Sequence, residues 1–321
     1  MQNSISMENT TSASLAVRLW RYQRERFPLG KHGMVIAAFS FSAVTLSALL
    51  RGVAVWPTWQ SVLTAFLTLL GFFFQLRVAD EYKDWAVDAR YRPERPVPRG
   101  LVTLTELRNV ALVIALLQIL AALWLDSLLL VPLGGVWLYM ALMRVEFGIG
   151  PWLQRWPLAY LISHMVVVPL IDLYATACDW LPHQGTLQHG TPLGLGWFLA
   201  VSFFNGIVIE IGRKTWAPAQ EREGVESYSS SWGICRALLL WSTALFAALV
   251  CALVLAGRIG FFWPLLGMLS GAAALLIWLG ACFVANPTGA GAERLETVSG
   301  LWVAGLYVMF GIVPMGVQLW I

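Results

Sequence analysis

The chain has 321 residues, of which 58% are hydrophobic, only 12% are charged and 17 are tryptophan. Soluble domains are about half apolar and about one quarter charged, so a water-soluble fold cannot bury this much apolar surface. This composition and a formal net charge of +3 exclude a disordered chain, a secreted disulfide scaffold and a nucleic-acid-binding protein.

The first 32 residues are predicted to form a cytoplasmic N-terminal segment without a cleavable signal pattern. Over residues 14–27, Leu15, Leu19, Trp20 and Phe27 are mixed with four arginines. This pattern is typical of a basic amphipathic helix that lies on lipid headgroups. The alternative is an exposed tail.

Nine apolar segments follow, each long enough to cross a bilayer core of about 30 Å. They are predicted at 33–51, 59–77, 106–125, 127–144, 157–177, 193–212, 234–256, 260–284 and 298–320. The expected fold class is therefore all-α: a polytopic bundle of about nine transmembrane helices that forms a single domain over 33–321.

The positions of Lys and Arg predict how this bundle lies in the membrane. Nineteen of the 21 fall on the N-terminal side of the spans, and only Arg51 and Arg258 fall on the other. Because basic residues stay in cytoplasmic loops, the N-terminus is predicted to be cytoplasmic and the C-terminus to lie on the opposite side. We expect an integral protein of the bacterial inner membrane.

A cluster of carboxylates follows the second span. On a helix that advances about 100° per residue, Asp80, Glu81, Asp84 and Asp88 share one face. Carboxylates beside a low-dielectric bilayer need a cation, and oxygen ligands select hard ions such as Mg²⁺. We therefore expect all four to be metal ligands for a Mg²⁺ cofactor, with Asp84 and Asp88 as catalytic residues. The alternative is a solvated loop in which Asp and Arg pair with each other.

Arginines alternate with prolines directly after these carboxylates. Arg92, Arg95 and Arg99 precede Gly100, and the prolines stiffen the loop. Guanidinium groups donate two hydrogen bonds to phosphate oxygens, so these arginines are candidate substrate-binding residues. An acidic face followed by arginines suits a diphosphate substrate bound through Mg²⁺. The alternative is that each arginine only obeys the charge bias of cytoplasmic loops.

The stretch DEYKDWAVDARYRPERPVPRG, from Asp80 to Gly100, resembles the first signature of the UbiA superfamily of intramembrane prenyltransferases. That signature is written NDxxDxxxD and is followed by RPxxxG. Asp80 takes the usual Asn position, the three other carboxylates take the Asp positions in order, and Arg95-Pro96 begins the RPxxxG match. The resemblance implies a nine-helix bundle with an active site that faces the cytoplasm.

A second charged stretch, residues 205–233, follows the sixth span. The corresponding signature of the superfamily is DxxDxxxD, followed by a short segment between two glycines. Gly224 and Gly233 keep that glycine spacing, whereas other residue types occupy the positions expected to be Asp. The second motif is therefore divergent.

The divergent motif contains one lysine between two glutamates. If one helix ran through, with a kink at Pro218, Glu210, Lys214 and Glu221 would share a face. Lys214 either holds a phosphate oxygen, which would be a catalytic role, or only pairs with Glu210 at i,i+4. Glu210, Glu221 and Arg213 are candidate substrate-binding residues, and the two glutamates are possible ligands of a second metal.

Polar residues within spans are functional hypotheses by default. His164 in the fifth span is a candidate substrate-binding residue: it would accept a proton from a nucleophile or stabilise a carbocation, or else make an interhelical hydrogen bond. Asn205 near the end of the sixth span is a further candidate for substrate binding. Glu146 is expected to pair with Arg144 or Arg155.

The function expected from these motifs is Mg²⁺-dependent ionisation of an isoprenyl diphosphate and transfer of the prenyl group to an acceptor. One alternative is a terpene cyclase, in which the prenyl chain captures its own cation. A less favoured alternative is a cation transporter, because the arginines would repel a travelling cation. The expected partners are the prenyl diphosphate and the lipid bilayer, with no nucleic acid and no obligate protein partner.

Overall fold

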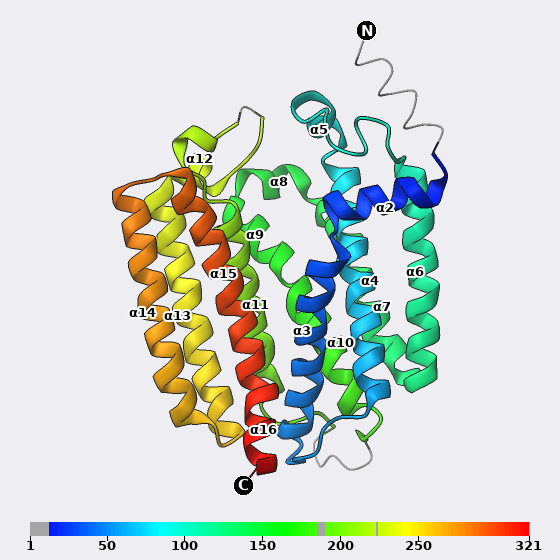
Figure 1. Ribbon diagram of the computed structural model, residues 1–321, viewed down its shortest axis with the longest axis vertical. Coiled ribbons are helices and arrows are strands. Elements are labelled where there is room, and N and C mark those ends of the chain that lie inside the picture. The colour runs from blue at the N-terminus through cyan, green and yellow to red at the C-terminus, as the bar shows by residue number, and fades with distance from the viewer. Residues whose placement is uncertain (1–12, 185–189, 223, 321) are drawn as a thin grey trace.

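The structure is a computed structural model that describes residues 13–184, 190–222 and 224–320. Within these residues every regular element is helical (Figure 1). The elements that make up the long apolar stretches are α3 (Leu29–Leu50), α4 (Trp59–Lys83), α6 (Leu104–Leu125), η1 (Ser127–Leu129), α7 (Leu130–Arg144), α9 (Pro157–Met165), α10 (Val167–Trp180), α11 (Leu195–Arg213), α13 (Ile234–Arg258), α14 (Phe262–Ala285), α15 (Gly289–Phe310) and α16 (Ile312–Trp320). Short helices join them at one end, namely α2 (Leu15–Arg26), α5 (Trp85–Tyr91), η2 (Glu146–Gly148), α8 (Gly150–Arg155), η4 (Pro218–Gln220) and α12 (Tyr228–Trp232).

Nine helical stretches in the described part of the chain are long and apolar enough to cross a membrane. They coincide with the nine predicted segments, so the prediction of an all-α polytopic membrane bundle is confirmed. The ninth stretch begins at Gly289, nine residues before the predicted start of 298. The charged residues Glu293, Arg294 and Glu296 ended the apolar segment in the sequence, but they lie on the first turns of α15.

The spanning helices form two groups that meet along the middle of the molecule (Figure 1). One group contains α3, α4, α6, α7 and α10, and the other contains α11, α13, α14 and α15. The groups join where α3 packs on α15 and where α10 packs on α11. A Cβ on Gly212 would lie 2.3 Å from the Ser299 hydroxyl oxygen, so glycine is required for α11 to approach α15 this closely.

We call the end of the bundle that carries α2, α5, α8 and α12 the basic end, because it holds most of the lysines and arginines. Helix α2 crosses the ends of α4 and α6 there (Figure 1). Its Tyr22 is buried beside Val78 of α4, and Arg18 pairs with Glu106 at 2.5 Å. The other face of α2 is open, and Trp20 is 59% exposed. The exposed-tail alternative therefore does not apply to α2.

Two buried carboxylates hold the helices together away from the basic end. Asp179 of α10 forms a two-bond ion pair with Arg51, at 2.9 Å for each bond, where α3 ends. Asp172 of α10 accepts hydrogen bonds from Ser202 of α11 and Tyr307 of α15. These contacts satisfy polar groups that would otherwise be costly inside a membrane, so both carboxylates serve the packing of the bundle.

Candidate functional site

The predicted acidic face begins at the basic end of α4. This helix ends at Lys83 and α5 begins at Trp85, with Asp84 between them. The backbone N–H of Asp84 donates to Asp80 O, and that of Asp88 donates to Asp84 O, both at 2.8 Å. The helical path is thus nearly continuous. Even so, no group of three or more Asp, Glu, His or Cys side chains in the described residues is placed to hold a metal ion.

Glu81 turns away from the other carboxylates and toward α2. Its Oε1 lies 2.6 Å from Nε of Arg26 and 3.4 Å from the Tyr22 hydroxyl, and its side chain is only 1% exposed. A buried carboxylate of this kind is neutralised by its own protein cation. The expected arrangement of four carboxylates around one cation is therefore not the arrangement in the structure, because a residue 55 positions away captures Glu81.

Asp88 is also buried and paired. Its Oδ2 lies 2.5 Å from Nη1 of Arg95, and its Oδ1 lies 4.0 Å from Nη1 of Arg92. The proline-rich loop folds back over α5, so these two arginines reach the carboxylate that precedes them. The Asp–Arg pairing considered as the alternative is present at Asp88, where the hydrogen bond from Arg95 fixes that guanidinium group at the edge of the loop.

Asp80 and Asp84 are the most open of the four carboxylates. Asp80 is 53% exposed, its only ion-pair partner in the described residues is Arg77 at 3.4 Å, and it interacts electrostatically with Arg213 and Glu210 of α11. Asp84 is half-buried, and its side chain makes no hydrogen bond or ion pair within the described residues. Asp80 thus faces the end of α11, and Asp84 lies four residues further along the same helical path.

Helix α11 ends in a triad of charges. Glu210 lies 2.6 Å from Nη2 of Arg213 and 2.9 Å from Nζ of Lys214. The triad is the i,i+4 pairing considered for Lys214, extended by Arg213 at i,i+3. Two cations and one carboxylate thus stand opposite Asp80.

The helix does not run on from Glu210 to Glu221, so those two glutamates do not share a face. After Arg213 the chain leaves the helix, Tyr228 N donates to Lys214 O at 2.9 Å, and Pro218 begins the separate turn η4. The carboxylate of Glu221 accepts hydrogen bonds from the hydroxyls of Ser227, at 2.7 and 2.8 Å, and Ser229, at 2.7 Å. It secures the loop before α12.

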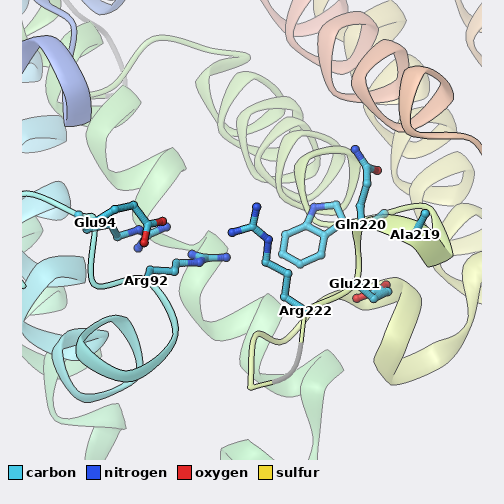
Figure 2. A pocket seen from close by; sticks show the side chains of 8 residues that line it. Arg92, Glu94, Ala219, Gln220, Glu221 and Arg222 are labelled. Atoms are coloured by element: carbon cyan, nitrogen blue, oxygen red, sulfur yellow. The ribbon is translucent and has the colours of Figure 1, made fainter.

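A cavity of about 510 Å³ lies between the two charged loops at the basic end (Figure 2). The first loop contributes Arg92, Glu94 and Arg95, and the second contributes Trp216, Ala219, Gln220, Glu221 and Arg222. In Figure 2 the guanidinium groups of Arg92 and Arg222 point toward each other across the cavity.

The electrostatics of the cavity favour an anion between these arginines. Burial lowers the pKa of Arg92, and the positive charges of Arg95 and Arg222 lower it further, although Asp88 acts in the opposite direction. Glu94 and Glu221 also line the cavity, but the serine hydroxyls engage Glu221. Opposed guanidinium groups repel each other unless a negatively charged ligand lies between them.

The two loops also touch beside this cavity. Gly224 has a φ of 72°, and a Cβ there would lie 2.3 Å from Cε2 of Tyr91, the last residue of α5. Glycine is required for both reasons, because other residues rarely adopt this φ and no side chain fits against the ring. Arg222 lies two residues before Gly224, and Arg92 directly follows Tyr91. The contact between Gly224 and Tyr91 therefore limits the distance between these two arginines.

Four other predicted residues lie outside the cavity lining. Arg99 pairs with Glu25 of α2 at 2.6 Å, and Asn205 is buried, where it accepts a hydrogen bond from Trp302 at 3.2 Å. His164 faces Glu146, with 3.6 Å between Nε2 and Oε2. The expected pairing of Glu146 with Arg144 or Arg155 is wrong, because the turn η2 directs Glu146 toward Lys83, at 2.7 Å.

Arg222 and Trp216 were not predicted as site residues. Both lie in the second charged stretch, where the predicted cations were Arg213 and Lys214. The available signal was that Arg222 directly follows Glu221 and carries, like Arg92 and Arg95, a guanidinium group suited to phosphate oxygens.

No protein-family model matches the sequence, and no curated protein matches it in sequence. Solved structures share its fold, including the two that follow. A digeranylgeranylglyceryl phosphate synthase matches with a TM-score of 0.61 and 14% identity, over 93% of this chain and 99% of its own. An apo UbiA homolog from Aeropyrum pernix K1 matches with a TM-score of 0.60 and 14% identity, over 89% of this chain and 98% of its own. The chain is thus similar in fold to these membrane proteins along nearly its whole length.

Proposed function

We propose that the chain is an intramembrane prenyltransferase of the UbiA superfamily that binds an isoprenyl diphosphate at the basic end. The observation that carries the proposal is the pair of guanidinium groups of Arg92 and Arg222, which face each other across the cavity. A diphosphate between them would accept hydrogen bonds from both guanidinium groups and balance their charge. The similarity in fold to a digeranylgeranylglyceryl phosphate synthase and to a UbiA homolog supports the same proposal.

The orientation follows from the same residues. The basic end carries the lysines and arginines that the charge bias assigns to the cytoplasm, so we place the diphosphate at the cytoplasmic surface of a bacterial inner membrane. The prenyl chain then extends toward the apolar helices. Trp20, Arg21 and Arg24 on the open face of α2 would contact the lipid headgroups beside the site.

Two of the four predicted carboxylates, rather than all four, are suited to bind Mg²⁺ at this site. Glu81 and Asp88 already have protein cations, whereas the Asp84 side chain has no partner in the described residues and Asp80 has only Arg77. Mg²⁺ typically binds one or two carboxylates together with substrate phosphates, so Asp80 and Asp84 would hold it. The bound ion would supply charge neutralisation on the diphosphate. Arg213 and Lys214 stand where a second ion would need carboxylates, which argues against a second metal at Glu210 and Glu221.

The chain's own cations favour departure of the diphosphate. Arg92 and Arg222 hold the phosphate oxygens in place, and Lys214 adds positive charge near the leaving group. Asp88 fixes the guanidinium group of Arg95, so this charge is in position before the reaction begins. The diphosphate gains a further negative charge as the C–O bond breaks, so fixed positive charge stabilises the leaving diphosphate more than the bound prenyl diphosphate and lowers the barrier to ionisation.

Two substitutions test this function in purified protein in lipid nanodiscs, supplied with allylic diphosphates of 10 to 20 carbons, Mg²⁺ and a cell lipid extract as the source of the acceptor. Asp84→Asn should lower diphosphate release by about 10²-fold or more, because it removes a carboxylate that no protein cation neutralises. Asp126→Asn, at the opposite end of α6, keeps its backbone-capping oxygen and is the matched control. Equal rates in the two variants would remove Asp84 from the mechanism, and cyclic products formed without an acceptor would indicate a cyclase instead.

A further inference from the structure

A second polar cluster at the basic end takes no part in the diphosphate site. It joins Lys83 at the end of α4, Glu146 of η2, and Tyr160 and His164 of α9. Lys83 Nζ lies 2.7 Å from Glu146 Oε1, contacts the Tyr160 hydroxyl and stands 4.5 Å from the centre of the Tyr160 ring. The His164 ring stacks on the Tyr160 ring, with 3.9 Å between centroids.

The hydrogen bonding of His164 leaves one acceptor without a donor. Its Nδ1 lies 2.9 Å from the backbone carbonyl of Tyr160, which can only accept, so Nδ1 carries the proton of the neutral ring. Nε2 is then an acceptor, and it faces Oε2 of Glu146 at 3.6 Å. That carboxylate oxygen is buried and has no hydrogen bond. These two hydrogen-bond acceptors face each other without a hydrogen atom to share, so the arrangement suits a proton or a donor group between them.

A strained turn holds Glu146 in this position. Glu146 and Phe147 have φ values of 50° and 55°, a region that residues other than glycine seldom occupy. Strain of this kind persists only where the surrounding contacts fix it. Phe147 packs edge-on against Tyr139 and His164, so the turn is fixed against the ring that Glu146 faces.

The cluster lies next to charged residues assigned above to the Mg²⁺ ion and to the leaving group, although it does not line the cavity. Lys83 precedes Asp84 in the chain, and His164 interacts electrostatically with Lys83, Glu146, Glu210 and Lys214. These are the charged groups that face His164 from η2, α4 and the end of α11. A nucleophile held at Nε2 of His164 would therefore stand beside a diphosphate bound at the basic end.

We propose that His164 accepts the proton of the prenyl acceptor, with Glu146 as its positioning residue, and that this acceptor carries an O–H or N–H group. The inference rests on the proposed function. As the C–O bond between C1 of the prenyl group and the diphosphate breaks, the acceptor oxygen or nitrogen forms its bond to C1. The acceptor proton moves to Nε2, and the diphosphate leaves with the electron pair. The step needs no oxidant and no reductant.

The experiment uses the full chain in nanodiscs, labelled geranylgeranyl diphosphate, Mg²⁺ and a cell lipid extract. Half of the extract is methylated beforehand so that its O–H and N–H groups are capped. The wild type should prenylate a component of the untreated extract and none of the methylated one. His164→Gln and His164→Ala should lower transfer about 10²–10⁴-fold and leave the Kd for labelled diphosphate within about threefold, because general-base catalysis contributes a factor of that size. Transfer by Glu146→Gln should fall between those of the wild type and His164→Gln.

Imidazole separates proton transfer from a structural role. Added imidazole should restore transfer by His164→Ala but not by His164→Gln, since only the smaller side chain leaves room for it. His32 is the matched control: its Nδ1 lies 3.1 Å from Pro28 O and its ring stacks on Phe27, yet it pairs with no carboxylate in the described residues. His32→Gln should transfer at the wild-type rate.

The outcomes distinguish the inference from the proposed function. If the wild type does not bind labelled diphosphate, the proposed function fails. If it binds the diphosphate but prenylates the methylated extract equally well, makes no product from the untreated extract, or retains transfer in His164→Ala without imidazole, the inference is wrong and the diphosphate site stands.

Discussion

Single residues in the acidic motif differ in role according to the partner that the fold gives them. Glu81 and Asp84 are three positions apart, yet Glu81 is buried against Arg26 and Tyr22 while the Asp84 side chain has no partner in the described residues. Burial raises the pKa of Tyr22, and the Glu81 carboxylate raises it further, so the phenol stays protonated and donates to that carboxylate. Glu81 therefore stabilises the protein, and Asp84 is available for chemistry.

Glu81→Gln should destabilise the protein without removing its activity. The substitution leaves the partly buried Arg26 guanidinium without its counter-charge, and loss of one partner from a largely buried pair costs about 3 kcal/mol. Thermal unfolding in nanodiscs should show the loss, while diphosphate release per folded molecule should change less than threefold. Asp84→Asn is predicted to show the reverse pattern. Loss of turnover in a folded Glu81→Gln protein would show that Glu81 acts in catalysis.

Gly224→Ala should impair the site and leave the bundle folded. The added methyl group must displace the Tyr91 ring, which changes the spacing of Arg92 and Arg222, and the backbone strain adds about 1–2 kcal/mol. We expect the KM for an allylic diphosphate to rise at least tenfold. Gly52→Ala is the matched control, since its φ is 77° but nothing lies within 4 Å of its Cβ position. An equal KM in both variants would show that the contact between the loops does not position the arginines.

At the level of whole elements, α2 is not a free segment but connects two spans and the proline-rich loop through ion pairs. Arg18 pairs with Glu106 of α6 and donates to Leu101 O at 3.1 Å, while Arg26 pairs with Glu81 of α4. Glu25 pairs with Arg99 at the end of the proline-rich loop. One helix thus fixes two spans and the loop that carries Arg92 and Arg95.

Arg18→Ala should lower the free energy of unfolding by about 1–2 kcal/mol, because it removes a bidentate, half-buried ion pair and a hydrogen bond to a carbonyl. Arg21→Ala is the control on the exposed face of the same helix, where no ion pair is present in the described residues. Denaturant unfolding in mild detergent measures both. If both variants lose the same free energy, the loss comes from helix propensity and not from the contact with α6.

The sequence predicts elements far better than it predicts partners. Span boundaries followed from apolar length, because the bilayer sets that length. The capture of Glu81 by Arg26 and the pairing of Glu146 with Lys83 did not follow, since helical spacing shows which face a residue shares and not which distant element covers that face. The separation of Glu221 from Glu210 did not follow for the same reason: the chain leaves α11 after Arg213, where Ser229 and Tyr228 bind it.

For the whole molecule, the Arg and Lys side chains that pair with buried carboxylates predict that its stability does not depend on a metal ion. Glu81, Asp88 and Glu210 are each neutralised by a protein cation, so no buried carboxylate at the basic end needs Mg²⁺ to be stable. Removal of Mg²⁺ with EDTA should stop diphosphate release and shift the Tm by less than about 2 °C in the absence of substrate. Tryptophan fluorescence follows the unfolding. A large fall in Tm would show that the ion holds the helices together.

The positions of α2 and α16 at opposite ends of the bundle have a practical consequence for handling the protein. Helix α2 lies at the basic end, whereas α16 lies at the far end (Figure 1). An affinity tag or fluorescent fusion attached before α2 would lie close to α2 and to the proline-rich loop that α2 contacts, and hinder both sterically. The same attachment after Trp320 would lie at the opposite end of the bundle, where it leaves the candidate site accessible.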